Sequence, residues 1–454
     1  MPRFSPDELL KALQSDAIAA DASLCVAYSG GLDSTVLLHA LARVVRVSSA
    51  HRLRAIHIDH QLHHDSARWR AHCESTAAAL GVPIVHLTVH VQHAGEGLES
   101  AARRARYGAL RARLQPEEIL LTAHHADDQL ETVLLALVRG AGVNGLSGIA
   151  SIQPFGPGRL ARPLLAFTRV ELASWAEAEG IEWIEDPSNE DTDLDRNYLR
   201  RRVLPALRDR WPAAAPSATR SASHLAEAAQ MLASAAHADM AQCAVGPCLD
   251  VAQLAAFDPA RRRNLLRYWI RQRGARAPST RKLAAIEHDL LPAGIDRTPC
   301  VDWDDVEVRR YRGLLYLDQR LPEFESSAAL VWDTGSPIEL PANLGRLLLQ
   351  PDPSGALSAA KLSSTLFVRF RAGGEMLRPA GDAHRRSLKK LLQSSGVPPW
   401  RRDRLPLIYS DDRLVAVGDL WISDEFAARD DASANVIWQK EGPASGKNVS
   451  ENSL

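Results

Sequence analysis

Residues 28–34, with the sequence YSGGLDS, place two glycines, a carboxylate and two serine hydroxyls between an apolar run at 23–28 and a helical pattern at 34–45. A strand followed by a helix puts the free N–H groups of the helix N-terminus at this turn, where they favour anions. Gly30 and Gly31 allow a close approach of the backbone to a ligand, and Ser34 is expected to cap the helix and offer its hydroxyl. The segment therefore predicts a phosphate-binding turn.

Asp33 follows the glycines, where a Walker A loop would carry a lysine. A carboxylate beside a polyphosphate is repulsive unless a cation lies between them, so Asp33 indicates a bridging Mg²⁺. The missing lysine favours chemistry at an α-phosphate, with pyrophosphate leaving, over transfer of a γ-phosphoryl group. An ordinary turn that precedes a capped helix is the alternative.

The hexapeptide SGGLDS resembles the PP-loop of the N-type ATP pyrophosphatase superfamily. Enzymes of this superfamily include some that adenylate a carbonyl oxygen and then let a nucleophile displace AMP. The resemblance implies that the ATP-binding residues are Ser29, Gly30, Gly31, Leu32, Asp33 and Ser34.

A second polar cluster occupies residues 124–132, at a predicted strand end and the first turns of a predicted helix. Asp128 and Glu131 are three residues apart and share a helical face, which suits Mg²⁺ or substrate positioning. We expect Asp33 and Asp128 to be the Mg²⁺ ligands. Two alternatives remain: a metal phosphohydrolase site built on the His/Asp cluster, and an acidic cap that complements the helix dipole.

Residues 121–149 resemble the HxxDDxxET…RGxGxxGL signature of tRNA(Ile)-lysidine synthetases and their nearest relatives. Residues 97–110 resemble the ARxxRY segment of that family, and residues 185–207 resemble its DPSN…RNxxRxxxxP segment. Arginines in these blocks suit nucleic-acid phosphates or a departing pyrophosphate. We expect catalytic roles for Asp33, Asp128, Arg103 and Arg200, and phosphate or tRNA contacts from Arg106, Arg196 and Arg201.

Residues 369–423 resemble the C-terminal domain of the longer, three-domain members of the family. This stretch is basic, and we expect its Arg385, Lys389 and Arg401 to contact tRNA. Residues 261–282 contain nine Lys and Arg and no acid, which also suits an RNA backbone. Solvated basic helices are the alternative. Tyr268 and Trp269 in this segment could be core residues or could stack on bases, and their helical spacing with Leu265 and Leu266 favours the core.

The chain has 454 residues and a formal net charge of −1, enough for two to four domains. Strand-like and helical patterns alternate over the first ~200 residues, so we expect an α/β fold with a parallel sheet. The predicted organisation is a Rossmann-like PP-loop domain at 1–215, a mainly helical middle domain at 216–320, a smaller α+β C-terminal domain at 321–438 and a disordered tail at 439–454.

Five scattered cysteines form no CxxC pair, which argues against a disulfide framework. The histidines at 57, 60, 63 and 64 fit no standard zinc spacing. Neither an apolar leader segment nor a membrane-spanning run is evident, so we expect no membrane association and a cytoplasmic protein.

The resemblance implies a ligase that uses ATP and Mg²⁺. It would adenylate O2 of the cytidine at the first anticodon position of tRNA(Ile) with a CAU anticodon. L-lysine would then displace AMP at C2, converting an AUG-reading tRNA into an AUA-reading one, and a homodimer is plausible. The competing hypotheses are a tRNA thiolase, an amidotransferase-type synthetase, a metal phosphohydrolase and a non-catalytic tRNA-binding protein.

Overall fold

The computed structural model describes residues 4–48, 52–59, 65–90, 98–185, 195–294, 297–320, 322, 329–429 and 433–440. The predicted tail at 439–454 therefore lies almost entirely outside the described residues. The chain divides into two compact units, Met1–Leu232 and Ala233–Leu454. This division falls inside one long helix, so the domain boundaries inferred from the sequence stay predictions.

The N-terminal unit is built on a six-stranded sheet of order β3-β2-β1-β4-β6-β5. All pairs are parallel except β5 with β6, which are antiparallel. This confirms the predicted parallel α/β fold. The strands are β1 Ser23–Ala27, β2 Arg52–Asp59, β3 Ile84–Thr88, β4 Ile119–Leu121, β5 Ile152–Phe155 and β6 Gly158–Ala161.

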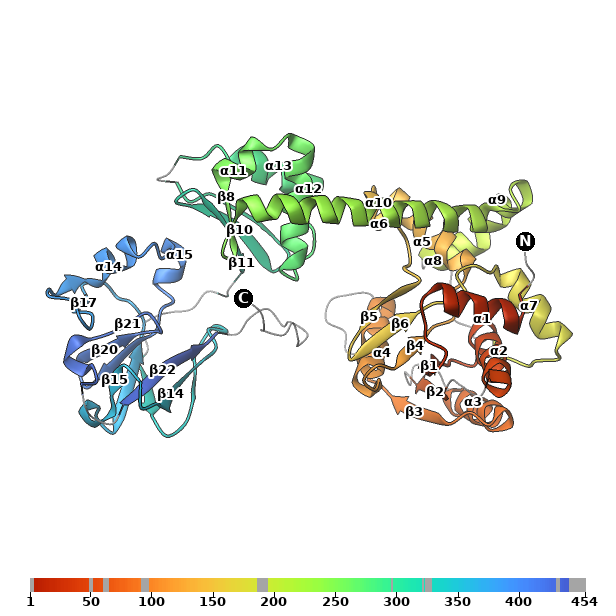
Figure 1. The fold of residues 1–454 in the computed structure, drawn as a ribbon, viewed down its shortest axis with the longest axis horizontal. Helices are drawn as coiled ribbons and strands as arrows, with labels where there is room; N and C mark the ends of the chain where they lie inside the picture. Colours follow the sequence, from red (N-terminus) through yellow and green to blue (C-terminus); the bar gives the residue numbers. More distant parts are fainter. Residues whose placement is uncertain are drawn as a thin grey trace. The chain divides into compact units, whose positions relative to one another are not determined.

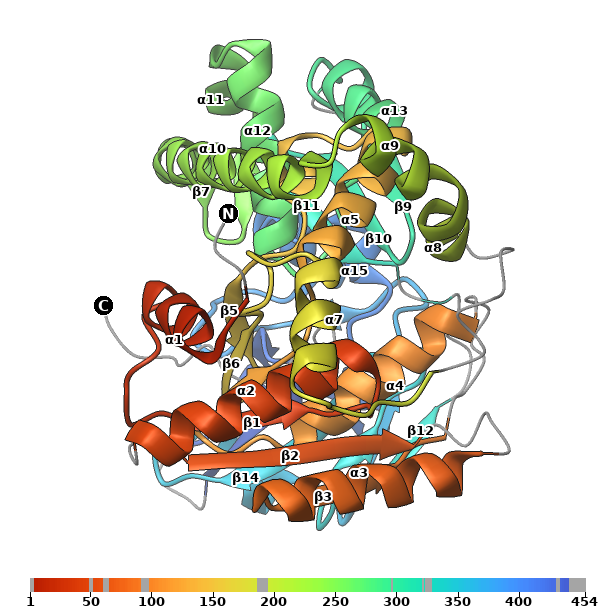
Figure 2. The same cartoon turned by 90° about the vertical axis from the view of Figure 1, so that its right-hand side faces the viewer.

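Helices cover both faces of this sheet (Figures 1 and 2). Leu24 and Val26 of β1 pack in the larger core with residues of α1, α2 and α7, whereas Cys25 packs on the other face with Leu110 of α4. The helices of this unit are α1 Pro6–Ser15, α2 Leu32–Ser48, α3 Ser66–Leu80, α4 Leu98–Arg113, α5 Ala126–Val138, α6 Val143–Leu146, α7 Arg169–Ala178, α8 Asp195–Tyr198, a π-helical turn at Leu199–Val203, α9 Leu204–Arg210 and α10 Ala214–Cys243, which crosses into the second unit.

The chain order reverses between β1 and β4, which are neighbours in the sheet. The connections from β1 to β3 run outward in one direction, and the connection from β3 to β4 returns to the other side of β1. In open α/β sheets, ligands bind in the crevice at the carboxyl ends of the strands where the order reverses. The segments that follow β1 and β4 are therefore the place to look for chemistry, and they contain both polar clusters singled out in the sequence.

Two local predictions were wrong. Helix α2 begins at Leu32 and not near Ser34, so Ser34 lies in the first helical turn and is not the N-cap. The alternating pattern predicts a further strand at the start of residues 162–181, followed by a helix, but β6 ends at Ala161 and residues 163–166 form a turn before α7. Tertiary pairing with β4 decides where β6 ends, and the apolar run that follows it packs into the core.

The first part of the second unit combines helices with a five-stranded antiparallel sheet of order β7-β8-β11-β10-β9. Trp269 is buried in its core, as the helical spacing predicted, whereas Tyr268 is only partly buried. The elements are β7 Ala244–Val245, β8 Cys248–Asp250, β9 Cys300–Trp303, β10 Val306–Tyr311, β11 Leu314–Gln319, α11 Val251–Ala256, α12 Pro259–Gln272, α13 Thr280–Ala285 and a π-helical turn at Ile286–Leu290.

The rest of the second unit contains two antiparallel sheets, β12-β16-β19-β20-β21 and β13-β14-β22-β15, with the short hairpin β17-β18. The α+β character expected for this region is confirmed. The elements are β12 Leu330–Asp333, β13 Ile338–Glu339, β14 Arg346–Pro351, β15 Leu357–Ser358, β16 Thr365–Arg369, β17 Met376–Leu377, β18 Arg386–Ser387, β19 Leu407–Ser410, β20 Arg413–Val417, β21 Trp421–Ile422, β22 Ser433–Gln439, 3₁₀ turns at Ala359–Lys361 and Asp424–Phe426, α14 Leu388–Ser394 and α15 Pro399–Arg402. Within the described residues, no helix is both long and apolar enough to span a membrane.

A buried ion pair closes the amino-terminal edge of the N-terminal sheet, opposite the crevice. Nε and Nη2 of Arg54 each donate to the carboxylate of Glu118 at 2.6 Å, and Glu118 is 2 % exposed. Arg54→Ala leaves this carboxylate buried without its cation, so we expect the free energy of unfolding of the N-terminal unit to fall by about 3 kcal/mol. Thermal or urea unfolding measures this loss.

The control is Arg43→Ala, which breaks an exposed arginine–carboxylate pair with Glu179. Exposed pairs contribute under about 1 kcal/mol, so this variant should unfold nearly as the wild type does. If both substitutions lowered the free energy of unfolding equally, burial of the Arg54–Glu118 pair would not explain its larger contribution.

Candidate active site

The PP-loop joins β1 to α2 and depends on the backbone conformation of Gly30. Gly30 has φ +84°, and a Cβ atom there would lie 2.9 Å from Sγ of Cys73 and 3.0 Å from Cδ1 of Ile184. The backbone N–H of Ile184 donates to the carbonyl of Gly30 at 2.9 Å. Glycine is therefore required twice, for the left-handed conformation and for the close packing around it.

Two hydroxyl groups in the first turn of α2 form hydrogen bonds with the backbone of the loop. Oγ of Ser34 accepts the backbone N–H of Ser29 at 3.2 Å and donates to the carbonyl of Gly31 at 3.1 Å. Oγ1 of Thr35 donates to the same carbonyl at 2.9 Å. The first turn of α2 thus faces the carboxyl end of β1 with its N–H groups, the arrangement that binds phosphate.

His125 joins the two acidic residues that the sequence singled out. Its Nε2 lies 3.6 Å from Oδ2 of Asp33, on α2, and 3.6 Å from Oδ2 of Asp128, on α5. The imidazole is 3 % exposed, whereas Asp33 is about one-third exposed. The predicted meeting of the two clusters is therefore present, with a histidine between them.

The charges of this group stabilise one another. Burial alone lowers the pKa of His125, but Asp128, Asp33 and Asp127 outweigh it and raise that pKa to about 9. Burial likewise raises the pKa of Asp128, but His125, His124 and Arg200 outweigh it and hold the carboxyl below its usual range. The site therefore contains an imidazolium and ionised carboxylates at neutral pH.

Asp127 belongs to the polar cluster at 124–132, but the sequence alone indicates no individual role for it. It is 3 % exposed, its Oδ2 accepts the backbone N–H of Arg169 at 2.7 Å, and its Oδ1 accepts Nη2 of Arg208 at 2.7 Å. The same Oδ2 lies 3.6 Å from Nδ1 of His125. Asp127 thus ties α7 and α9 to the start of α5 and orients the histidine. Arg208 lies eight residues after Arg200, a spacing that could have signalled a shared helical face.

Arg200 is bound to two carboxylates. Its Nε donates to Oε1 of Glu131 at 2.5 Å, and its Nη2 donates to Oδ1 of Asp128 at 2.8 Å. Burial raises the pKa of Glu131, and Arg200 opposes that shift. Asp128 also accepts the backbone N–H of His125 at 3.0 Å, so it caps α5 as well as contributing to the cluster.

The remaining arginines predicted in the N-terminal unit lie on two helical segments. On α4, the guanidinium of Arg103 lies 5.0 Å from the ring centroid of Tyr107, and that of Arg106 lies 5.6 Å from it. Arg196 is half-buried in α8, and Arg201 is exposed in the π-helical turn that follows.

The arrangement suits Mg²⁺ bound together with phosphate groups. Oδ1 of Asp33 is buried without a hydrogen-bond partner, and the Asp33 and Asp128 carboxylates approach the same nitrogen. Mg²⁺ is typically held by one or two carboxylates plus substrate phosphates. Among the described residues, no group of three or more His, Cys, Asp or Glu side chains forms a metal site alone. Three of the four histidines weighed for zinc lie outside the described residues.

In the second unit, Arg385 and Lys389 are exposed, while Arg401 pairs with Asp318. In the basic segment 261–282, Arg261 pairs with Asp239, and Arg262 and Arg263 pair with Glu287. The segment is thus less positive in the fold than in the sequence.

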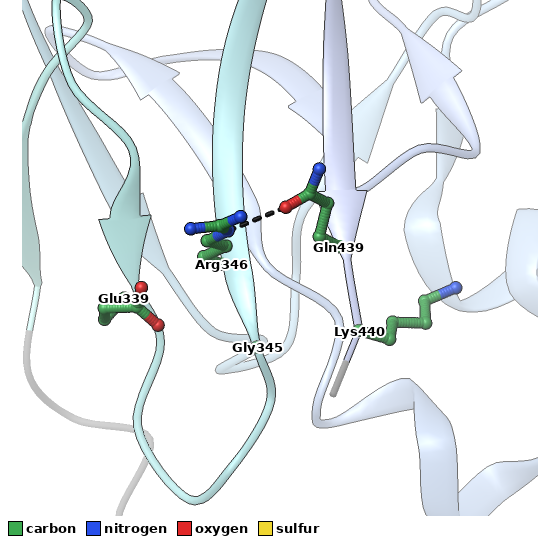
Figure 3. A pocket seen from close by; sticks show the side chains of 5 residues that line it. All are labelled: Glu339, Gly345, Arg346, Gln439 and Lys440. Carbon is green, nitrogen blue, oxygen red and sulfur yellow. Dashed lines mark hydrogen bonds between the residues drawn. The ribbon is translucent and has the colours of Figure 1, made fainter. Parts of the chain in front are cut away.

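A pocket in the C-terminal sheet is lined by Glu339, Gly345, Arg346, Gln439 and Lys440 (Figure 3). Nε of Arg346 donates to Oε1 of Gln439 across it at 2.7 Å. None of the predicted site residues lines this pocket.

Family models match three parts of the chain. Residues 5–207 match the PP-loop domain, residues 249–316 the TilS substrate binding domain, and residues 366–438 the TilS substrate C-terminal domain. The fold and the loop therefore define a PP-loop protein, a class that uses ATP.

Comparison with curated proteins shows which family of PP-loop proteins the chain belongs to. The tRNA(Ile)-lysidine synthase of Alkalilimnicola ehrlichii is 42% identical over 98% of this chain and 99% of its own length. That of Coxiella burnetii is 39% identical over 94% of each chain, and that of Escherichia coli O157:H7 is 40% identical over 92% of this chain and 96% of its own. The chain belongs to the tRNA(Ile)-lysidine synthase family.

Solved structures give more distant likenesses. The U34-tRNA thiolase NcsA of Methanococcus maripaludis, with its [4Fe-4S] cluster, aligns at a TM-score of 0.42 and 16% identity, covering 49% of this chain and 78% of that one. A TilS C-terminal domain aligns at a TM-score of 0.21 and 21% identity, covering 25% of this chain and 100% of that one.

The geometry of the PP-loop predicts that Gly30→Ala weakens ATP binding. The substitution imposes an unfavourable backbone conformation and pushes the loop away from Cys73 and Ile184, so we expect KM for ATP to rise about tenfold or more. Steady-state pyrophosphate release measures this change.

Gly81→Ala is the matched control for Gly30→Ala. Gly81 also has a positive φ, +70°, but a Cβ atom there would meet no atom within 4 Å. That variant should keep its KM for ATP, and a similar rise in both variants would mean that general destabilisation is the cause.

The raised pKa of His125 predicts a pH-dependent contribution to stability. Because the folded pKa of about 9 exceeds the ordinary value of 6.5, this contribution is complete below pH 6.5 and is lost as the pH rises through about 9. In Mg²⁺-free buffer, the melting temperature of the wild type should therefore fall more steeply between pH 6.5 and 9 than that of His125→Gln. If the melting temperatures of the two proteins fell equally over this pH range, His125 could not be charged in the folded protein.

Proposed function

We propose that this enzyme, a tRNA(Ile)-lysidine synthase by family, ligates L-lysine to C2 of the cytidine at the first anticodon position of tRNA(Ile) with a CAU anticodon. ATP first adenylates O2 of the cytosine and releases pyrophosphate. The lysine amine then forms the C–N bond at C2, loses a proton and displaces AMP. The product tRNA reads AUA in place of AUG.

One observation supports this chemistry most directly: Asp33 of the PP-loop and Asp128 of the second cluster meet at His125, beyond the carboxyl ends of the neighbouring strands β1 and β4. A site for attack at an α-phosphate needs a phosphate cradle and acidic groups for a metal at the same sheet edge. Both are present there, and a phosphate-binding lysine is absent from the loop.

In this proposal Ser29–Ser34 hold the ATP phosphates through the helix N-terminus and the loop hydroxyls. Asp33 and Asp128 are the Mg²⁺ ligands, and Mg²⁺, when bound, stabilises the charge on the departing pyrophosphate. Arg103 and Arg200 are the cationic side chains assigned to charge developing in the reaction. In the structure, Arg200 balances Asp128 and Glu131 and so keeps the acidic side of the site ordered.

Contacts to tRNA are assigned to Arg106, Arg196, Arg201, Arg385, Lys389 and Arg401. Arg385 and Lys389 are the most accessible of them in the second unit, so their removal should weaken tRNA binding without changing the chemistry. A homodimer in the cytoplasm is part of the same proposal, and sedimentation equilibrium measures the oligomeric state.

The thiolase hypothesis requires a reactive thiol, and the thiols nearest the crevice do not suit that role. All five cysteines are free, and both Cys25 and Cys73 are buried. Burial raises the pKa of each of these two thiols to about 12, so both are protonated at neutral pH and are poor nucleophiles.

The decisive experiment incubates the protein with ATP, Mg²⁺, radiolabelled lysine and unmodified transcripts of isoleucine and methionine tRNAs, both with a CAU anticodon. We expect label only in the isoleucine transcript, with an equal amount of pyrophosphate released. Release that depends on tRNA without label would indicate another nucleophile. ATP hydrolysis without tRNA or lysine would favour a phosphohydrolase, and tRNA binding alone a non-catalytic protein.

Asp33→Asn tests the magnesium role. The amide is isosteric but uncharged, so we expect pyrophosphate release to fall at least about a hundredfold while circular dichroism and melting behaviour stay close to wild type. Near-full adenylation by this variant would rule out Asp33 as a metal ligand.

A further inference from the structure

His57 is a buried histidine of β2 to which the proposed reaction assigns no role. Its strand lies beside the PP-loop strand, because β2 pairs in parallel with β1 (Figure 2). His57 is 5 % exposed, and its Nδ1 lies 3.0 Å from the carbonyl oxygen of Tyr28. Tyr28 is the last residue before the PP-loop, so this contact is made where the chain enters the loop.

The partner of His57 decides which ring nitrogen carries the proton. A carbonyl oxygen can only accept a hydrogen bond, so Nδ1 must be the donor. Burial lowers the pKa of His57, and the bond to the Tyr28 carbonyl opposes this shift only in part. The imidazole is therefore neutral at neutral pH, with its one N–H group at Nδ1.

The peptide group between Tyr28 and Ser29 is held at both ends. Oγ of Ser34 accepts its N–H at 3.2 Å, and Nδ1 of His57 donates to its carbonyl oxygen. In a trans peptide the N–H and the C=O point in opposite directions, so a bond at each end fixes the plane of the peptide. The backbone N–H of Tyr28 also donates to the carbonyl of Ile56 at 2.9 Å. The chain therefore enters the PP-loop in one orientation.

This orientation matters for the binding of an anion. The N–H groups in the first turn of α2 attract phosphate, whereas a carbonyl oxygen carries partial negative charge and repels it. Ser34 holds the N–H of the peptide on the side of α2, so the carbonyl is directed to the side of β2, where His57 satisfies it. Without that donor, the buried carbonyl would have to turn toward the loop to find another partner, and its dipole would then oppose the phosphates.

We propose that His57 is a positioning residue for ATP, which acts through the peptide between Tyr28 and Ser29 and keeps the PP-loop in the conformation that accepts phosphate. The proposal rests on the use of ATP by PP-loop proteins and not on the transfer of lysine. ATP binding is measured without tRNA or lysine, so a failure of the proposed function and a failure of this inference are told apart.

The test compares two amides that differ in the position of their N–H group. The amide nitrogen of Asn can take the place of Nδ1 of His, whereas that of Gln reaches the place of Nε2. We expect His57→Gln to raise the Kd for ATP with Mg²⁺ about tenfold, the contribution of one buried hydrogen bond, and His57→Asn to stay within about threefold of the wild type. Isothermal titration calorimetry measures both values.

Steady-state kinetics separate positioning from a general loss of structure. In pyrophosphate release, KM for ATP should rise in His57→Gln as Kd does, while kcat at saturating ATP stays close to that of the wild type. His57→Asn should restore KM. A purely structural role would lower kcat and the melting temperature together and would not distinguish the two amides.

His86→Gln is the matched control. His86 is the partner of His57 in the pairing of β2 with β3, and the centroids of the two rings lie 5.4 Å apart. Nε2 of His86 lies 3.2 Å from Oε1 of Glu74, on α3. This substitution removes a neighbouring imidazole but leaves the bond between His57 and Tyr28 in place, so the Kd for ATP should not change.

Other results would overturn the proposal. A wild-type Kd in His57→Gln would mean that His57 does not position the loop. Equal rises in His57→Asn and His57→Gln would mean that the shape of the ring matters and not the hydrogen bond from Nδ1, and a similar rise in His86→Gln would indicate general destabilisation. Should His57→Gln fail to fold, His57→Asn decides alone: a wild-type Kd supports the proposal, and a tenfold higher one contradicts it.

Discussion

The need to neutralise buried carboxylates at one edge of the N-terminal sheet governs the arrangement of this enzyme. Asp127, Asp128 and Glu131 occupy the first turns of α5 with little access to water. Removing ionised groups from water costs several kcal/mol each unless cations accompany them. Arg208 and Arg200 supply those cations from helical segments that follow the sheet in sequence. The folding of the π-helical turn and α9 onto α5 is therefore an electrostatic requirement as much as a packing one.

The same charges decide how the loop after β1 meets the loop after β4. His125 is charged because three carboxylates surround it, and it in turn holds Asp33 and Asp128 close together. Two carboxylates that approach each other without such a cation would repel, and one of them would take up a proton. The imidazolium thus keeps both groups ionised before a metal and a nucleotide arrive. Asp127, by binding the backbone of Arg169, extends this constraint to the start of α7.

The sequence was sufficient for much of this architecture and for part of the site. Alternating strand and helix patterns predicted the parallel sheet, and the glycine turn and the acidic cluster predicted that Asp33 and Asp128 would meet. The start of α2 at Leu32 could not be predicted from the sequence. The hydroxyl of Ser34 hydrogen-bonds to the backbone of the loop that precedes it and does not act as the N-cap of the helix. His125 was recognised as part of the polar cluster but received no individual role, and Arg208 was missed, because their importance lies in burial and in partners distant in sequence.

The two edges of the sheet show why the carboxyl edge is the functional one. At the amino edge, Arg54 and Glu118 satisfy each other, and Glu118 also accepts the backbone N–H of Gln115 at 2.9 Å. At the carboxyl edge, polar atoms of Asp33, Glu131 and Arg162 are buried without hydrogen-bond partners. A fold tolerates such groups where a ligand completes them, because their desolvation is otherwise uncompensated. The unpaired atoms at the carboxyl edge belong to side chains of both charge signs, whereas the charges of Arg54 and Glu118 at the amino edge neutralise each other.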